Sequence, residues 1–109
     1  MTKAFYDEVA TFKKEFILPF KFSKSYGHFT QMVWAESWTL GCGKVVFKEG
    51  SLYMTLIVCN YGPTGNVEKK SMYKIGKPCS DCPLNTCCGD SCKRSGFRIY
   101  YQGLCKKII

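Results

Sequence analysis

The spacing of the cysteines limits the fold of this chain more than any other feature of its sequence. The 109 residues include eight cysteines, and six of them fall between positions 79 and 105. An even number at this density is typical of a small domain that disulfides hold in an oxidising compartment. A chain of this length buries only about 60–65% of its unfolded surface, so disulfides would compensate for a thin core.

The cluster CSDCPLNTCCGDSC at positions 79–92 admits two interpretations. The pair Cys79-x-x-Cys82 with two later thiolates is a pattern for tetrahedral zinc, and the surrounding Lys and Arg would then suggest a nucleic-acid-binding knuckle. The even cysteine count, the adjacent Cys87 and Cys88 and the lack of a histidine in this region favour disulfides and no nucleic-acid partner. We expect these cysteines to pair among themselves: Cys79, Cys82, Cys87, Cys88, Cys92 and Cys105. Their spacing alone does not fix which cysteine bonds to which.

The charge of the chain is concentrated in its second part. Residues 1–68 hold seven Lys/Arg and six Asp/Glu, whereas residues 69–109 hold nine and two. This asymmetry predicts a nearly neutral domain over residues 1–70 and a basic, cysteine-rich tail over residues 71–109 that prefers anionic surfaces. Solubility alone would also account for such an excess of basic residues.

A helical period runs through residues 3–17. Its apolar positions form one stripe: Phe5, Val9, Phe12 and Phe16. The pattern predicts an amphipathic helix that ends before Pro19 and places Glu8 at the margin of the buried face. A carboxylate at that margin is either a half-exposed surface acid or a group that points into a cleft.

His28 is the only histidine of the chain, and it stands at the start of a second, shorter helical pattern. The positive end of a helix disfavours a protonated ring, so the neutral ring, which can bind metal, is favoured. A buried histidine with one hydrogen bond is the alternative. We expect both helices to pack on the following hairpin and to bring Glu8 and His28 to one rim.

That hairpin is predicted from residues 44–48 and 52–59, which are rich in strand formers, with Glu49-Gly50-Ser51 as the turn. Folding about this turn brings Cys42 and Cys59 nearly opposite each other and predicts a disulfide between them. No apolar stretch approaches the roughly 20 residues of a membrane-spanning helix. The first residues, MTKAFYDEV, lack the apolar core of a signal peptide.

Two stretches, GHFTQMVWAES at 27–37 and LIVCNYGPTGNV at 56–67, resemble the signature motifs of the CAP superfamily of cysteine-rich secretory proteins, venom allergens and pathogenesis-related proteins. FYDEV at 5–9 resembles the helix before them, and GKPCSDCP at 76–83 resembles the start of the cysteine-rich hinge. The resemblance covers residues 4 to about 88 and implies an α+β fold. That fold is a partial α-β-α sandwich with a small antiparallel sheet, followed by a disulfide-rich tail.

The resemblance also implies roles for His28 and Glu8. In the family, the matching histidine and glutamate line a cleft with a second histidine and a second glutamate, and the four groups can hold a divalent metal. The second pair comes from the front half of the domain, which this sequence lacks, so His28 and Glu8 are an incomplete half-site. We expect no cofactor here, and a divalent metal such as zinc only where the missing half is present. The signal peptide is expected to have been lost with that half.

Within the tail, resemblance to the hinge implies the pairs Cys79–Cys87 and Cys82–Cys92, which leaves Cys88–Cys105. We expect a secreted, extracellular, non-enzymatic protein of venom, saliva or defence type that binds a sterol, another lipid or a membrane protein target. An enzyme is not expected, because two ligands are too few for a catalytic metal and Ser25 near His28 lacks an orienting acid. The alternative is a toxin that blocks ion channels through its basic tail. The tail residues expected to contact the target are Lys93, Arg94, Phe97, Arg98, Tyr100 and Tyr101. The sequence indicates no oligomeric state.

Overall fold

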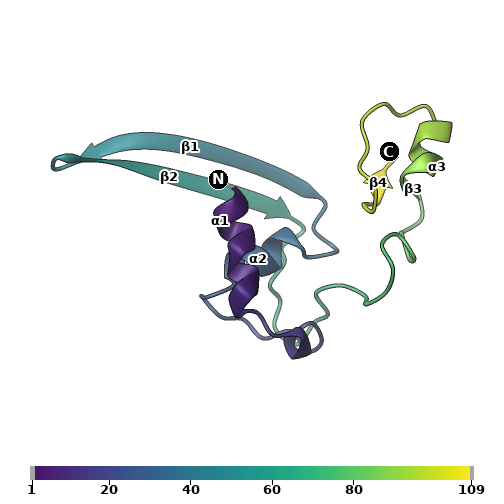
Figure 1. The fold of residues 1–109 in the computed structure, drawn as a ribbon, viewed down its shortest axis with the longest axis horizontal. Coiled ribbons are helices and arrows are strands. Elements are labelled where there is room, and N and C mark those ends of the chain that lie inside the picture. Colours follow the sequence, from purple (N-terminus) through teal and green to yellow (C-terminus); the bar gives the residue numbers. More distant parts are fainter. Residues whose placement is uncertain (1, 109) are drawn as a thin grey trace. The chain divides into compact units, whose positions relative to one another are not determined.

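The computed structural model describes residues 2–108, which form two compact units that divide between Tyr73 and Lys74. It confirms the α+β class, the small antiparallel sheet of the first unit and the disulfide-rich C-terminal region (Figure 1). Among the described residues, no helix is both long enough and apolar enough to span a bilayer.

The first unit begins with three short helical segments in place of one helix. They are the α-helix α1 (Thr2–Tyr6) and the 3₁₀ helices η1 (Asp7–Thr11) and η2 (Lys14–Phe16). The continuous helix predicted over residues 3–17 is therefore wrong, because Phe12 and Lys13 adopt extended backbone angles. The ring of Phe12 packs edge-on against Tyr26, with 5.0 Å between the ring centroids. The hydroxyl of Thr11 donates to backbone carbonyls at Glu8 and Ser25. These contacts draw the chain away from a regular helix, as tertiary packing often does with β-branched and aromatic residues.

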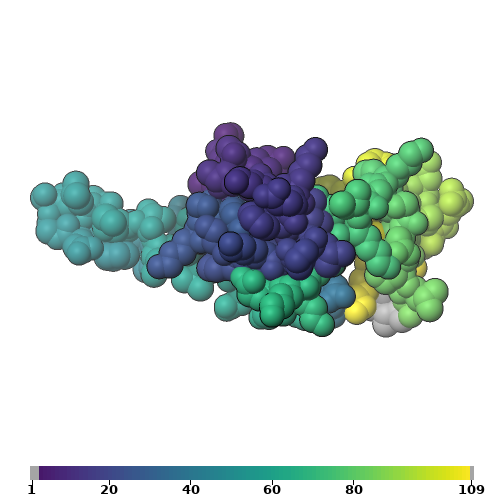
Figure 2. Space-filling model, turned by 90° about the horizontal axis from the view of Figure 1, so that it is seen from below, coloured from purple at the N-terminus to yellow at the C-terminus, as the bar shows by residue number. Residues whose placement is uncertain are grey.

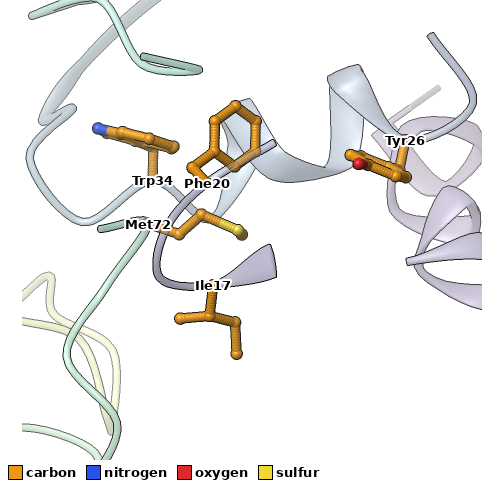
Figure 3. Packing of buried hydrophobic residues seen from close by; sticks show 5 residues of the cluster. All are labelled: Ile17, Phe20, Tyr26, Trp34 and Met72. Atoms are coloured by element: carbon orange, nitrogen blue, oxygen red, sulfur yellow. The ribbon is translucent and has the colours of Figure 1, made fainter. Parts of the chain in front are cut away.

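A small aromatic core lies behind these segments. It consists of side chains that are at most 5% exposed: Ile17, Phe20, Tyr26, Trp34 and Met72 (Figure 3). The rings of Phe20 and Trp34 meet edge to face, with 5.0 Å between their centroids. Such a contact adds about 0.5–1.5 kcal/mol to the burial of the two rings.

Backbone hydrogen bonds fasten a distant segment of the chain to this core. The N–H of Phe20 donates to the carbonyl of Lys70 at 2.8 Å, and the N–H of Lys69 donates back to the carbonyl of Phe20 at 2.9 Å. The N–H of Met72 donates to the carbonyl of Ile17 at 2.9 Å. These bonds hold Met72 in the core and fasten residues 69–72, at the end of the first unit, to residues 17–20.

The sheet of the first unit is a two-stranded antiparallel hairpin of β1 (Thr39–Glu49) and β2 (Leu52–Gly62). Its two-residue turn begins with Gly50, whose φ of 61° lies in the region that favours glycine. The register places Cys42 opposite Cys59, and the expected disulfide joins them. Both strands are longer than the sequence predicts, and most of their residues are exposed. The hairpin extends away from the helices as a narrow ribbon (Figures 1 and 2).

The second unit has little regular structure. Its elements are β3 (Thr86–Cys87), the helix α3 (Asp90–Arg94) and β4 (Lys106–Lys107), with β3 and β4 paired antiparallel. Cys92 is fully buried and Cys87 is 4% exposed, so sulfur atoms take the place of a hydrophobic core. Disulfides rather than a packed hydrophobic core stabilise this unit, as expected of so short a segment.

The six cysteines of this unit pair among themselves, but not as the resemblance implies. The disulfides are Cys79–Cys88, Cys82–Cys105 and Cys87–Cys92, so the expected pairs Cys79–Cys87, Cys82–Cys92 and Cys88–Cys105 are wrong. The reason is local. Gly89, with φ of 53°, turns the chain into α3 directly after Cys88, and this sharp return brings Cys92 back to Cys87.

Candidate functional site

The site expected from the sequence is built where η1 meets the first turn of the helix α2 (Gly27–Met32). One carboxylate oxygen of Glu8, Oε1, accepts the backbone N–H of His28 at 2.9 Å and that of Phe29 at 3.1 Å. These are the N–H groups that a short helix leaves without partners in its first turn. Glu8 therefore caps α2 from a distant point in the sequence, which satisfies two backbone donors and places a negative charge at the positive end of the helix.

The other carboxylate oxygen of Glu8 orients the imidazole of His28. Oε2 lies 2.8 Å from Nδ1 of His28. Because an ionised carboxylate only accepts hydrogen bonds, Nδ1 carries the hydrogen in this contact and leaves Nε2 as the free ring nitrogen. The ring of Phe5 stacks on the imidazole with 4.4 Å between centroids and 12° between planes. The side chain of His28 is 62% exposed, whereas that of Glu8 is only 20% exposed.

These contacts determine the protonation of Glu8. Partial burial of the carboxyl raises its pKa, but the backbone N–H of Phe29, the ring of His28 and the backbone N–H of His28 lower it by more. The pKa of Glu8 therefore lies below its ordinary value, and the carboxylate is ionised at neutral pH.

The two residues meet by a different route from the one predicted. The sequence suggested that the helices would pack on the hairpin and converge at its rim. In the structure α1 and η1 pack on α2, while the residues of β1 are exposed along the whole strand. The contact between Glu8 and His28 depends on helix packing alone.

The donor set of this pair does not fit a metal ion. Both carboxylate oxygens of Glu8 already accept hydrogen bonds, and Nδ1 of His28 is one of the donors. Nε2 of His28 and the remaining lone pair of Oε2 of Glu8 offer two ligand atoms at most, whereas stable zinc sites use three or four protein ligands. In this structure the pair caps α2 and orients the imidazole of His28, and Nε2 is the ring nitrogen that does not take part in these contacts.

The tail contains a group of sulfur atoms that matches the other metal pattern of the sequence. The Sγ atoms of Cys79, Cys82 and Cys105 all lie within 4.8 Å of one another. Each sulfur is bonded in a disulfide, so none is a thiolate ligand in this state of the chain. The proximity arises because the disulfides Cys79–Cys88 and Cys82–Cys105 lie side by side.

The residues expected to contact a target have different environments in the second unit. Lys93 and Arg94 are exposed in the last turn of α3, and Arg98 and Tyr101 are exposed in the loop that follows. Phe97 and Tyr100 are half-buried, and the ammonium group of Lys106 lies 5.2 Å from the centroid of the Phe97 ring. Phe97 is thus engaged within the unit.

Sequence reasoning did not identify the polar contacts that tie α2 to the turn after β2. The hydroxyl of Thr30, which is fully buried, donates to the side-chain oxygen of Asn66 at 2.7 Å. The side-chain oxygen of Gln31 accepts the N–H of Gly65 at 3.0 Å. A Cβ on Gly65 would lie 2.6 Å from the side chain of Gln31, so this position requires glycine. All four residues belong to the stretches GHFTQMVWAES and LIVCNYGPTGNV. Their place in these two motifs was the sequence signal that could have pointed to the contacts.

Comparison with known proteins agrees with this architecture. The model of the Cysteine-rich secretory protein family, CAP, matches residues 1–61. "Venom allergen 5" of Tityus serrulatus is 46% identical over 104 residues, which are 94% of this chain and 25% of the relative. "CRISP/Allergen/PR-1" of Trittame loki is 51% identical over 104 residues, or 93% of this chain and 25% of the relative. "Scoloptoxin SSD976" of Scolopendra dehaani is 37% identical over 103 residues, or 94% of this chain and 42% of the relative.

The chain belongs to the CAP family. It spans about a quarter of the length of the first two relatives that it matches. Their similarity extends over the second unit as well, because the matches cover 93–94% of this chain and the family model ends at residue 61.

Proposed function

We propose that this chain is part of a secreted, non-enzymatic CAP protein of venom, saliva or defence type, and that its disulfide-stapled tail contacts the target. Three of the relatives are named "Venom allergen 5", "Cysteine-rich venom protein" and "Scoloptoxin SSD976". The eight cysteines form four disulfides, which persist in an oxidising, extracellular compartment.

The observation that carries the non-enzymatic part of the proposal is the bonding of Glu8. A general base must have a free lone pair within reach of the proton that it removes. The carboxylate of Glu8 uses three of its about four lone-pair sites to hold the first turn of α2 and the ring of His28, which leaves it little capacity to take a proton from a substrate. The test is hydrolysis of casein and of a nitrophenyl ester by the full chain and by His28→Ala. We expect both to show only the background rate, and turnover that His28→Ala abolishes would contradict the proposal.

We also propose that the chain binds divalent metal weakly or not at all, since His28 and Glu8 supply at most two ligands and leave the other coordination positions to water. Calorimetric titration with zinc and with cobalt is the measurement, and a chain joined to the front half of a CAP domain is the comparison. Stoichiometric tight binding by the short chain that is lost in His28→Ala would refute this proposal. Tight binding only by the longer chain would support the half-site interpretation.

A sterol or another lipid is the ligand that we propose for the first unit. A shallow apolar hollow on the hairpin is lined by Gly43, Lys44, Val45, Leu56 and Val58. The glycine opposite Val58 and the cross-strand pair Val45–Leu56 leave aliphatic surface uncovered there. We expect saturable binding of radiolabelled cholesterol that Val58→Asp abolishes and that Tyr53→Asp, near the turn, leaves unchanged. Equal loss in both variants would remove the hollow as the site.

The second candidate function is ion-channel block by the tail. It is favoured by the exposed basic side chains of Lys93, Arg94 and Arg98, which lie within six positions of one another on a disulfide-stapled frame. Voltage-clamp recording on excitable cells tests it. Block that disappears when these three residues are changed to Gln would establish the toxin function, and unaltered currents with the original chain would exclude it for the channels recorded.

A further inference from the structure

One loop of the second unit runs from the end of α3 to Cys105 and arches away from the β3–β4 ladder (Figure 1). Its two ends are held. Cys92 in α3 is buried and bonded to Cys87, and Cys105 is bonded to Cys82. The N–H of Phe97 donates to the carbonyl of Cys92 at 3.0 Å, which fixes the start of the arch. We call residues 98–104 the stapled loop.

The stapled loop exposes its aliphatic and aromatic side chains. Ile99 is 73% exposed, Tyr101 is 68% exposed and Leu104 is 61% exposed. Gln102, in contrast, reaches back to Gly89, where a Cβ would lie 2.5 Å from its side-chain oxygen. Gln102 thus lies beside Gly89 of its own unit, although it is itself exposed, and the three apolar side chains are exposed as well. Three large apolar side chains exposed within six positions of a loop held at both ends make it a candidate interaction surface.

The region around the stapled loop is uniformly basic. Residues 91–108 contain five Lys/Arg and no Asp or Glu. They are Lys93 and Arg94 at the end of α3, Arg98 in the loop, and Lys106 and Lys107 in β4. Of the two acids in the second unit, Asp81 is paired with Lys74, and Asp90 lies in the first turn of α3. Positive charge therefore flanks the exposed apolar side chains in sequence on both sides.

This combination matches the interface of an anionic bilayer. Aliphatic side chains insert among the acyl chains, and tyrosine rings are enriched at the level of the headgroups. Nearby Lys and Arg are attracted to anionic lipids. A held loop also loses little conformational freedom on binding. A bilayer, unlike a protein pocket, does not require a surface of complementary shape. Exposed apolar side chains with Lys and Arg on either side are enough to bind it.

We propose that the stapled loop docks the chain on anionic lipid membranes, with Ile99 and Leu104 inserted among the acyl chains, Tyr101 at the level of the headgroups and the flanking bases on the lipid phosphates and carboxylates. This inference rests on the proposed function, in which the tail contacts the target, and it identifies that target as lipid. A protein target for the same surface is the competing outcome.

The test is co-sedimentation of the full chain with vesicles of phosphatidylcholine, with and without about 30% phosphatidylserine. We expect binding only to the vesicles with phosphatidylserine, and its loss at about 0.5 M salt, where surface charges are screened. The double variant Ile99→Ser, Leu104→Ser should bind at least about tenfold more weakly. Arg98→Gln should bind about fivefold more weakly.

The matched control is Leu84→Ser, which removes a 93% exposed leucine of the same unit outside the loop and should leave binding unchanged. Disulfide mapping of each variant verifies that the staples have formed. Equal weakening by Leu84→Ser, or no binding to phosphatidylserine vesicles, would overturn the inference. If the chain ignores vesicles but binds cells until they are treated with protease, the target is a protein and the proposed function stands. If it binds neither, both proposals fail.

Discussion

The two units of this chain are stabilised by different means. The first unit buries Phe20, Trp34 and Met72 almost completely and ties them with backbone hydrogen bonds, and its one disulfide lies out on the hairpin. The second unit joins three disulfides within 36 residues and buries little besides Cys87 and Cys92. Packing specifies the first unit and covalent bonds specify the second. A surface loop in the second unit can therefore expose apolar residues that a packed domain would need for its core.

The largest effect should come from the aromatic core. Trp34→Ala removes a 4% exposed ring from the contact with Phe20, and we expect a loss of about 3–5 kcal/mol in the unfolding free energy of the first unit. Denaturant unfolding followed by tryptophan fluorescence of Trp38 measures it. If the two units are stabilised separately, the tail disulfides of this variant should remain as in the original chain. Scrambled tail disulfides would show that the second unit needs the first.

The next effect should come from the disulfides of the second unit, graded by the loops that they close. Cys82–Cys105 spans 23 residues and Cys87–Cys92 spans five. By loop-closure entropy, replacing the first pair with serine should cost about 3 kcal/mol and replacing the second about 2 kcal/mol. Protection of the Phe97 amide against hydrogen exchange reports the loss, and the Met72 amide is the control. An equal drop at Met72 would contradict the separation of the two units.

An effect confined to the hairpin is expected from its own disulfide. An isolated two-stranded hairpin is marginal in water, and few of the residues of β1 and β2 are buried. By the same loop-closure relation, at a sequence separation of 17, replacing Cys42 and Cys59 by serine should lower the free energy for opening the hairpin by about 3 kcal/mol. Exchange of the hairpin amides should accelerate while that of Phe20 and Met72 does not change. No acceleration would mean that the strands are held by something other than the disulfide.

The smallest effect concerns the carboxylate of Glu8. Because its pKa is lowered in the folded chain, its contribution to stability is present above the unfolded pKa and is lost as the pH falls through the folded value. Glu8→Gln should cost about 1 kcal/mol at pH 7 and remove this part of the acid dependence below about pH 4. Unfolding curves at several pH values measure it, with the exposed Glu15→Gln as control. An identical acid profile for Glu8→Gln and the original chain would contradict the capping role.

The parts of the fold that follow local rules are predictable from the sequence. The hairpin follows from strand formers on either side of Glu49-Gly50-Ser51, and its register brings Cys42 to Cys59. The core does not follow from local rules, because Met72 lies in a basic, irregular segment and meets Ile17 through packing and a backbone bond between residues far apart in the sequence.

The candidate site was predictable in part. That Glu8 and His28 meet could be inferred, but the capping of α2 could not, because the capping carboxylate lies 20 positions before His28 and such a contact has no local sequence signature. The pairing within the tail was beyond reach for a similar reason. It depends on the turn at Gly89 and on a ladder of two residue pairs, Thr86 with Lys107 and Cys87 with Lys106. Neither feature has a periodic signature in the sequence.

One measurement tests most directly whether packing holds the first unit and disulfides hold the second. Hydrogen exchange is followed on the full chain before and after all four disulfides are reduced and alkylated. We predict that the amides of Phe20 and Met72 keep most of their protection after reduction, while those of Cys92 and Phe97 exchange as in an unfolded chain. Loss of protection at all four amides together, or continued protection at Cys92 and Phe97, would contradict this account.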